Sequence, residues 1–183
     1  MNSKNAEIEL KHIQIELENN RTQHMRHFID QYYCYKNGFV NSNGKASWDK
    51  ILWNGFVSVN AKNETDRSKI IKEHIIPLKF IVSKLKELSQ SKLTSIDSIE
   101  KCINEYLMFA TITKAEDATL RKHKLTSTMP SGFYEKEHAL YQNKFARYQV
   151  AGIEIIQTLQ EPQFAHKLAR TIYNGLLSLR SIF

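Results

Sequence analysis

Glu73 and His74 place a carboxylate next to an imidazole, directly before Ile75-Ile76-Pro77. A proline disfavours helical backbone in the residue before it, so the chain from about Ser68 to Ile76 is predicted to be extended. Pro77 also suits the first turn of the helix that we expect after it. His74 then stands near the end of a strand, where its side chain can face a cleft. A neutral imidazole, with a pKa of about 6.5, can deprotonate water near neutral pH.

A second group of acidic residues follows Thr113. The preceding run, Leu107–Ile112, is short, apolar and rich in β-forming residues, which predicts a strand buried on both faces. Thr113 and Glu116 have the spacing of a capping box, so a helix is predicted to start at Lys114. Its first turns carry Glu116 and Asp117, and carboxylate oxygens are the ligands that Mg²⁺ prefers.

The segment 73–77, together with the strand at 107–112 and the helix from Lys114, resembles the active-site motif of HNH endonucleases. Proteins of that family have the ββα-metal fold. The resemblance implies a ββα unit over residues 68–125, and a helical insertion at 78–106 splits the unit between its two strands.

The same resemblance implies the roles of four residues. It makes His74 the general base and Asp117 a metal ligand, with Glu73 or Glu116 as further ligands. A divalent cation such as Mg²⁺ would then offset the charge on the phosphorus and on the leaving oxygen. The expected activity is metal-dependent cleavage of nucleic acid.

The chain also departs from the HNH pattern. Met108 and Thr111 stand in the region where many members carry a central Asn, and the helix more often carries His or Asn at the place of Asp117. One turn later stands Arg121, which cannot bind a cation and is suited to clamping phosphate. The site is therefore either a divergent one-metal centre or a fold that has kept binding and lost its chemistry.

A purely structural interpretation of the same residues also stands. Glu73 and His74 can be a partly buried pair satisfied by backbone hydrogen bonds. Glu116 and Asp117 can be ordinary first-turn acids, which the helix dipole favours.

The charge of the chain favours an acidic partner. The 183 residues include 26 Lys and Arg against 19 Asp and Glu, which gives a net charge of +7. Such an excess favours nucleic acid, or a protein complex that binds it, as the partner. The candidate phosphate-binding residues are Arg121, Lys122, Lys124, Lys144 and Arg147. Basic residues at the end of a helix also complement its dipole, so this second role stays open for 121–124.

The rest of the chain is predicted to be helical. Apolar spacing predicts a long helix over 6–36, although alternation at 13–17 also fits a strand. Turn-forming residues at 37–44 end that element. Ser47 can cap a short helix whose apolar stripe is Trp48, Ile51, Leu52 and Phe56, and residues 60–66 then form a polar connector.

The second half adds four further amphipathic helices. They are predicted at 78–88, 96–106, 134–150 and 164–176. The tail 176–183 stays apolar to its end, so we expect it to be docked or to contact a partner, with a homodimer through the C-terminal helix as one arrangement. The expected fold class is α+β and predominantly helical, a single domain over 1–183 with an N-terminal helical region at 6–60 and C-terminal helices at 134–183.

Several classes of protein are excluded by what the sequence lacks. It has no P-loop, no dinucleotide fingerprint, no nucleophile elbow and no paired Cys-x-x-Cys motif. Cys34 and Cys102 are expected to be buried, reduced thiols, and the absence of an apolar signal core or membrane-length run predicts a cytoplasmic protein with no membrane partner.

Two functions therefore remain as the main hypotheses. The first is an HNH-like endonuclease of a defence or mobile-element type. The second is a non-enzymatic basic inhibitor from a phage or mobile element, of the anti-CRISPR or anti-restriction type, that binds a host nucleoprotein machine. A helical scaffold or dimerisation module is a third. Only the first predicts that His74→Ala abolishes activity without loss of folding.

Overall fold

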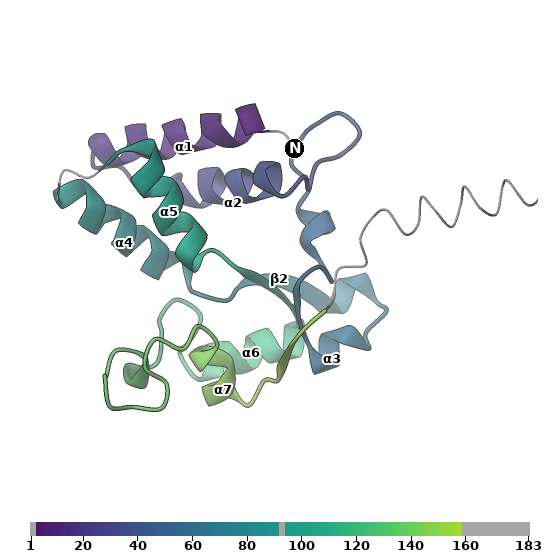
Figure 1. The fold of residues 1–183 in the computed structure, drawn as a ribbon. Helices are drawn as coiled ribbons and strands as arrows, with labels where there is room; N and C mark the ends of the chain where they lie inside the picture. The colour runs from purple at the N-terminus through teal and green to yellow at the C-terminus, as the bar shows by residue number, and fades with distance from the viewer. Residues whose placement is uncertain (1–2, 92–93, 159–183) are drawn as a thin grey trace, which may run out of the picture.

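A computed structural model of the chain describes residues 3–91 and 94–158. This part of the chain is α+β and predominantly helical, with a small four-stranded sheet between two layers of helices (Figure 1). The predicted fold class is confirmed.

The described residues form seven α-helices, four strands and some short 3₁₀ turns. The helices are α1 (Ser3–Glu18), α2 (Met25–Lys36), α3 (Val59–Lys62), α4 (Leu78–Gln90), α5 (Ile96–Tyr106), α6 (Lys114–Lys122) and α7 (Ala146–Ala151). The strands are β1 (Phe56–Ser58), β2 (Ile70–His74), β3 (Phe109–Thr113) and β4 (Ile155–Gln157).

The sheet has the strand order β2-β3-β1-β4. Strands β1 and β3 are parallel, and β2 and β4 run antiparallel to their neighbours. In the β2–β3 pair His74 lies opposite Phe109, and Ile70 lies opposite Thr113. The end of β2 therefore meets the beginning of β3, whereas α6 starts at the other end of this pair.

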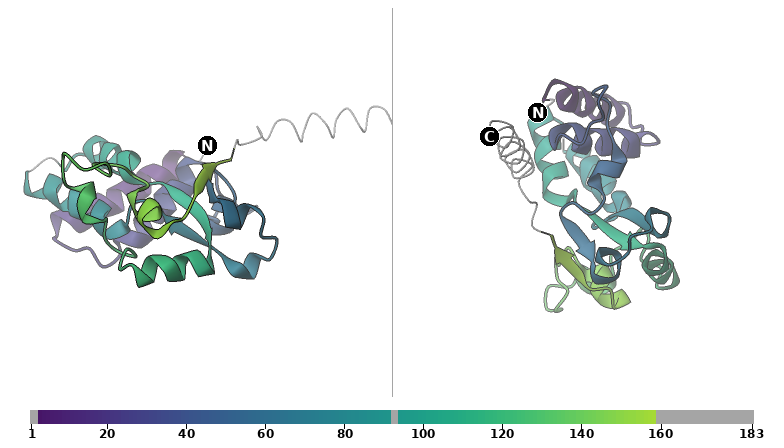
Figure 2. Two further views of the ribbon diagram at one scale, coloured as in Figure 1. Left: turned by 90° about the horizontal axis from the view of Figure 1, so that it is seen from below. Right: turned by 90° about the vertical axis from the view of Figure 1, so that its right-hand side faces the viewer.

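Each face of the sheet has its own apolar core, because alternate residues of a strand point to opposite faces. Phe109 belongs to the core covered by α1, α2, α4 and α5, which we call the α2 face. Ala110 and Ile112 belong to the core that contains Leu120 of α6 and Tyr148 of α7, which we call the α6 face. Figures 1 and 2 show these two layers of helices on opposite sides of the strands.

The predictions for residues 70–122 are largely confirmed. Strand β2 ends at His74, and α4 begins directly after Pro77. The first four residues of β3 are buried, as expected of a strand covered on both faces. The capping box of α6 is present: the Glu116 N–H donates to Thr113 Oγ1 at 3.1 Å, and the Thr113 N–H donates to Glu116 Oε2 at 2.8 Å.

The single long helix predicted over 6–36 is wrong, since α1 ends at Glu18 and α2 begins at Met25. Asn20 turns the chain with a φ of 52°, a conformation that Asn tolerates better than most residues. The Arg21 N–H donates to the Glu16 carbonyl at 2.7 Å and closes the turn. Both helices bury a stripe in one core, so the apolar spacing runs across the break without revealing it.

The helix predicted over 134–150 is also wrong, because only Ala146–Ala151 is helical. Residues 134–145 fold as successive turns that side chains hold. His138 Nδ1 accepts from the Leu140 N–H at 3.0 Å, and Asn143 Oδ1 accepts from the Phe145 N–H at 2.9 Å. Such local bonds compete with helical hydrogen bonding, and they leave this segment as a long surface loop.

The region 48–62 differs from its prediction as well. A 3₁₀ turn at Trp48–Ile51 replaces the short helix, and Phe56 begins β1 instead of extending a helical stripe. Gly55, with a φ of 84°, redirects the chain between them. The partners of β1 are β3 and β4, which are distant in sequence, so no local pattern indicates this strand.

Cys34 and Cys102 are buried free thiols, as expected, and burial raises the pKa of each to about 11. None of the helices in the described part of the chain is long and apolar enough to cross a membrane. The predicted helix at 164–176 and the apolar tail lie outside the described residues.

Candidate functional site

His74 is a core residue on the α2 face of the sheet. Its side chain is almost fully enclosed, with 4% of the residue exposed. Nε2 lies 2.8 Å from Oδ1 of Asp30, a buried carboxylate on α2. The ring also packs at 4.5 Å between centroids against Phe109. The imidazole is thus oriented by a carboxylate, as a general base requires, but it faces a helix instead of an open cleft.

Lys72 completes a small ionic cluster with Asp30. Its Nζ lies 3.6 Å from Asp30 Oδ2 and is held between two rings, 4.0 Å from the Trp48 ring and 4.5 Å from that of Phe109. Burial lowers the pKa of Lys72, and the charge of Asp30 partly offsets this effect. Burial alone would raise the pKa of Asp30, but the hydrogen bond from His74 and the charges of His74 and Lys72 lower it below its ordinary value of 3.8.

The lowered pKa of Asp30 predicts a loss of stability in acid. A carboxyl group whose pKa is lower in the folded chain stabilises the fold above its unfolded pKa of about 3.9, and this contribution is lost as the pH falls through the folded value. The free energy of unfolding, measured by urea denaturation from pH 6 down to pH 2, should fall less steeply in Asp30→Asn than in the wild type. Asp97→Asn, which changes an exposed carboxylate on α5, is the control and should keep the wild-type slope.

Glu73 points to the α6 face, where it is paired with Arg147. The Arg147 guanidinium is fully buried and lies 2.8 Å from Glu73 Oε1. It also donates to the carbonyls of His74, Ile75 and Leu125. These bonds join β2, the segment after α6, and α7, so both Glu73 and Arg147 hold the structure together.

Glu116 is buried and accepts from several donors. Ser58 Oγ lies 2.6 Å and the Thr113 N–H 2.8 Å from Oε2, and Asn60 Nδ2 lies 3.0 Å from Oε1. The carboxylate therefore ties the end of β1 to the start of α6. Asp117, one residue on, is 2.9 Å from Arg121 of the same helix.

The structure does not bring the predicted nuclease residues together. His74 lies on the α2 face, and the carboxylates of α6 belong to the other layer. They are also at opposite ends of the β2–β3 pair, about 13 Å apart along the strands at about 3.3 Å per residue. Glu73, Glu116 and Asp117 each have partners of their own, so this donor set does not fit a metal ion. Within residues 3–91 and 94–158 no group of three or more His, Cys, Asp or Glu side chains could hold one.

The predicted phosphate-binding residues are also dispersed. Arg147 is buried and unavailable. Arg121 is mostly exposed but paired with Asp117, and Lys122 and Lys124 are exposed around the end of α6. Lys144 borders a hollow in the surface.

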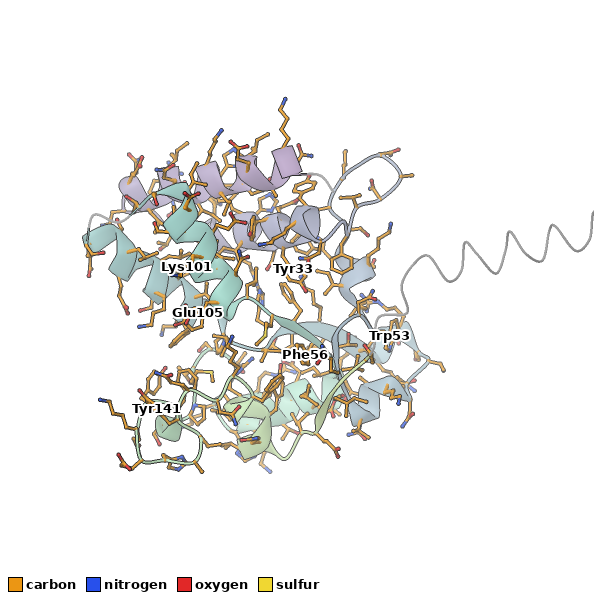
Figure 3. The ribbon with its side chains drawn as sticks, viewed as in Figure 1. Tyr33, Trp53, Phe56, Lys101, Glu105 and Tyr141 are labelled. Carbon is orange, nitrogen blue, oxygen red and sulfur yellow. The ribbon has the colours of Figure 1, made fainter. Side chains whose placement is uncertain are left out.

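That hollow lies between α4, the end of α5 and the loop at 126–144. It has a volume of about 350 Å³. The side chains that line it are mostly aromatic: Phe80, Tyr106, Phe133, Tyr134 and Tyr141. Tyr134 and Tyr141 are 57% and 36% exposed, high values for aromatic residues. Figure 3 shows Tyr141 on the lower loop and Glu105 at the lower end of α5 above it.

Phe80 is the centre of this aromatic group. Its ring makes edge contacts with Tyr106 at 5.2 Å and with Phe133 at 5.5 Å, and Phe133 contacts Tyr134 at 5.2 Å. Burial and the neighbouring Glu105 raise the pKa of Tyr106 to about 12, so its phenol is neutral at pH 7. The rings form a preformed apolar surface that is open to solvent.

A second hollow of about 240 Å³ continues the first. The two share Phe80, Lys84 and Tyr134, and together we call them the α4 groove. We call the first the aromatic hollow and the second the polar hollow, because the second is lined, apart from Phe80 and Tyr134, by residues with polar or charged side chains: Lys79, Ser83, Lys84, Glu87, Ser127 and Thr128. In the described part of the chain, neither Lys79 nor Lys144 is paired with a carboxylate; Lys144 Nζ donates to the Glu105 carbonyl at 2.6 Å.

Sequence reasoning missed the α4 groove because it placed Tyr134 and Tyr141 inside a helix. A signal was available in the chain between 126 and 144, where a hydroxyl-rich run at 126–131 is followed by three aromatic residues and two lysines. The backbone of this loop turns at Gln142, whose φ is 51° and whose N–H donates to the Phe133 carbonyl at 3.0 Å.

A further hollow lies beside the carboxyl ends of β1 and β3 and measures about 640 Å³. Lys69 lies 3.4 Å from Glu64, Glu116 is bonded as described above, and none of the residues that line this hollow is aromatic. It therefore carries less indication of a ligand than the α4 groove.

Comparisons of the chain with protein-family models, curated proteins and solved structures find no match.

Proposed function

We propose that the chain binds single-stranded nucleic acid through the α4 groove. The observation that carries the proposal is the exposed Tyr134 ring, set among other rings and flanked by Lys79 and Lys144, neither of which has a carboxylate partner in the described part of the chain. Bases stack on such rings, and lysines along the same groove attract the phosphates. The net charge of +7 also favours binding to the negatively charged phosphates of nucleic acid.

The shape of the groove favours a single strand over a duplex. Aromatic rings can stack only on bases whose faces are exposed, which a paired duplex does not offer except at its ends. The Ser127 hydroxyl can donate to phosphate beside Lys79. The Thr128 hydroxyl already donates to the Lys124 carbonyl at 3.0 Å, and Lys84 is paired with Glu87 at 2.8 Å. A groove built for an acidic peptide would need the lysines but not the rings.

Hydrolysis of nucleic acid, with His74 as the base, is a separate proposal. Its support is the HNH resemblance and the Asp30–His74 hydrogen bond. The positions of these residues on opposite faces of the sheet make binding, and not cleavage, the better-supported function. A non-enzymatic inhibitor that competes for nucleic acid would also need to bind nucleic acid in this way.

Binding can be measured by fluorescence anisotropy of labelled single-stranded DNA and RNA. The wild type should bind both with an affinity that falls steeply with salt. Tyr134→Ala should weaken binding about tenfold, because loss of one base–aromatic stack costs about 1–3 kcal/mol. Lys79→Ala should weaken it less and reduce its salt dependence.

Matched controls exist on other surfaces. Ile15→Ala removes an exposed apolar side chain from α1, and Lys45→Ala removes an exposed lysine from the loop after α2. Both should bind like the wild type. Equal affinity in Tyr134→Ala and Ile15→Ala would contradict the proposed groove, and tighter binding of an acidic peptide than of any oligonucleotide would contradict the ligand class.

A further inference from the structure

The aromatic hollow of the α4 groove contains a carboxylate that phosphate binding does not explain. Glu105 lies on the last turn of α5 and lines the hollow together with the tyrosine rings. Its side chain is exposed, and in the described part of the chain it has no ion pair. A negative charge beside lysines weakens attraction for phosphate, so its contribution would have to come from another part of the ligand.

The carboxylate of Glu105 lies beside the hydroxyl group of Tyr106, whose pKa it raises. The backbone carbonyl of Glu105 accepts from Lys144 Nζ at 2.6 Å, which connects the end of α5 to the loop. Across the hollow, Gln142 Nε2 donates to the Tyr141 hydroxyl at 3.0 Å. A base stacked in this hollow would therefore lie next to the Glu105 carboxylate.

We infer that the hollow selects guanine through Glu105, an inference that rests on the proposed binding of single-stranded nucleic acid. An unpaired guanine presents two adjacent donors, the N1–H and the 2-amino group, and the two oxygens of a carboxylate can accept from both in parallel. Adenine, cytosine and thymine each have an acceptor beside their donor on this edge, and a carboxylate repels it. The stacked ring provides affinity, and Glu105 provides the choice of base.

The polar hollow is placed to bind the phosphate next to the bound base. Tyr134 and Phe80 border both hollows, so a strand that places a base in the aromatic hollow passes directly into the polar one. Lys79 and the Ser127 hydroxyl then hold the adjoining phosphate. Base and phosphate are thus recognised by separate sets of side chains.

The test uses the full chain and twelve-nucleotide oligo(dT) strands that carry one central dG, inosine, dA or dC. The dG strand should bind about tenfold more tightly than the dA and dC strands and than unmodified oligo(dT). Inosine keeps the N1–H but lacks the 2-amino group, so it should lose most of this preference. The Glu105→Gln variant should lose the preference for dG. It should still bind oligo(dT) at least as tightly as the wild type does.

Glu87→Gln is the matched control, because Glu87 lines the polar hollow and not the aromatic one. It should keep the full preference for dG. Equal binding of all the strands, or a dG preference that persists in Glu105→Gln, would overturn the inference and leave the proposed function intact. A chain that binds none of the oligonucleotides would overturn both.

Discussion

Arg147→Met should lower the free energy of unfolding by about 3–5 kcal/mol, because it removes a fully buried guanidinium and leaves the partly buried Glu73 carboxylate without its partner. The guanidinium pairs with Glu73 and donates to the backbone carbonyls of Ile75 and Leu125. Such a loss is a large share of the 5–15 kcal/mol that stabilises a typical domain. Chemical denaturation followed by circular dichroism measures it.

Two variants make this prediction specific. Arg147→Lys keeps the charge but not the planar set of donors, so it should recover only part of the loss. Arg121→Met removes an exposed ion pair on α6 and should cost less than about 1 kcal/mol. If Arg147→Met were as stable as Arg121→Met and instead lost binding to nucleic acid, the phosphate-binding role predicted from the sequence would be restored.

His74→Ala should destabilise the fold by about 3–5 kcal/mol, because it removes one partner of a buried pair. Asp30 would be left with Lys72 alone, at 3.6 Å. Asp30→Ala should cost a similar amount. The double variant should cost less than the sum of the two, with a coupling energy of about 1–3 kcal/mol, since the second substitution removes a group that has already lost its partner.

His123→Ala is the control, because His123 is an exposed histidine after α6, and it should change the free energy of unfolding by less than about 0.5 kcal/mol.

The same variants test cleavage if they are incubated with single-stranded DNA and RNA in Mg²⁺ or EDTA. A His74→Ala protein that is as stable as the wild type, and that loses a Mg²⁺-dependent cleavage activity which the wild type has, would contradict the structural role and favour the HNH-like endonuclease.

The sequence by itself determined the elements whose signals are local. Pro77 separates β2 from α4, and the Thr113–Glu116 capping box starts α6 at Lys114. These signals act within one turn of helix or a few residues of strand, so they can be recognised without knowledge of the fold. They were sufficient for the order of elements from 70 to 122 and for the fold class.

Only the tertiary structure decided what the charged residues do. Whether His74 faces a cleft or α2, and whether Arg147 meets phosphate or Glu73, depends on the register of β2 against β3 and on which layer covers each face. Both depend on contacts between residues far apart in the chain. The α4 groove has the same origin, because it joins α4 to a loop that begins more than thirty residues after that helix ends. Local spacing carries no information about such contacts, since they form only when the two apolar cores are buried together.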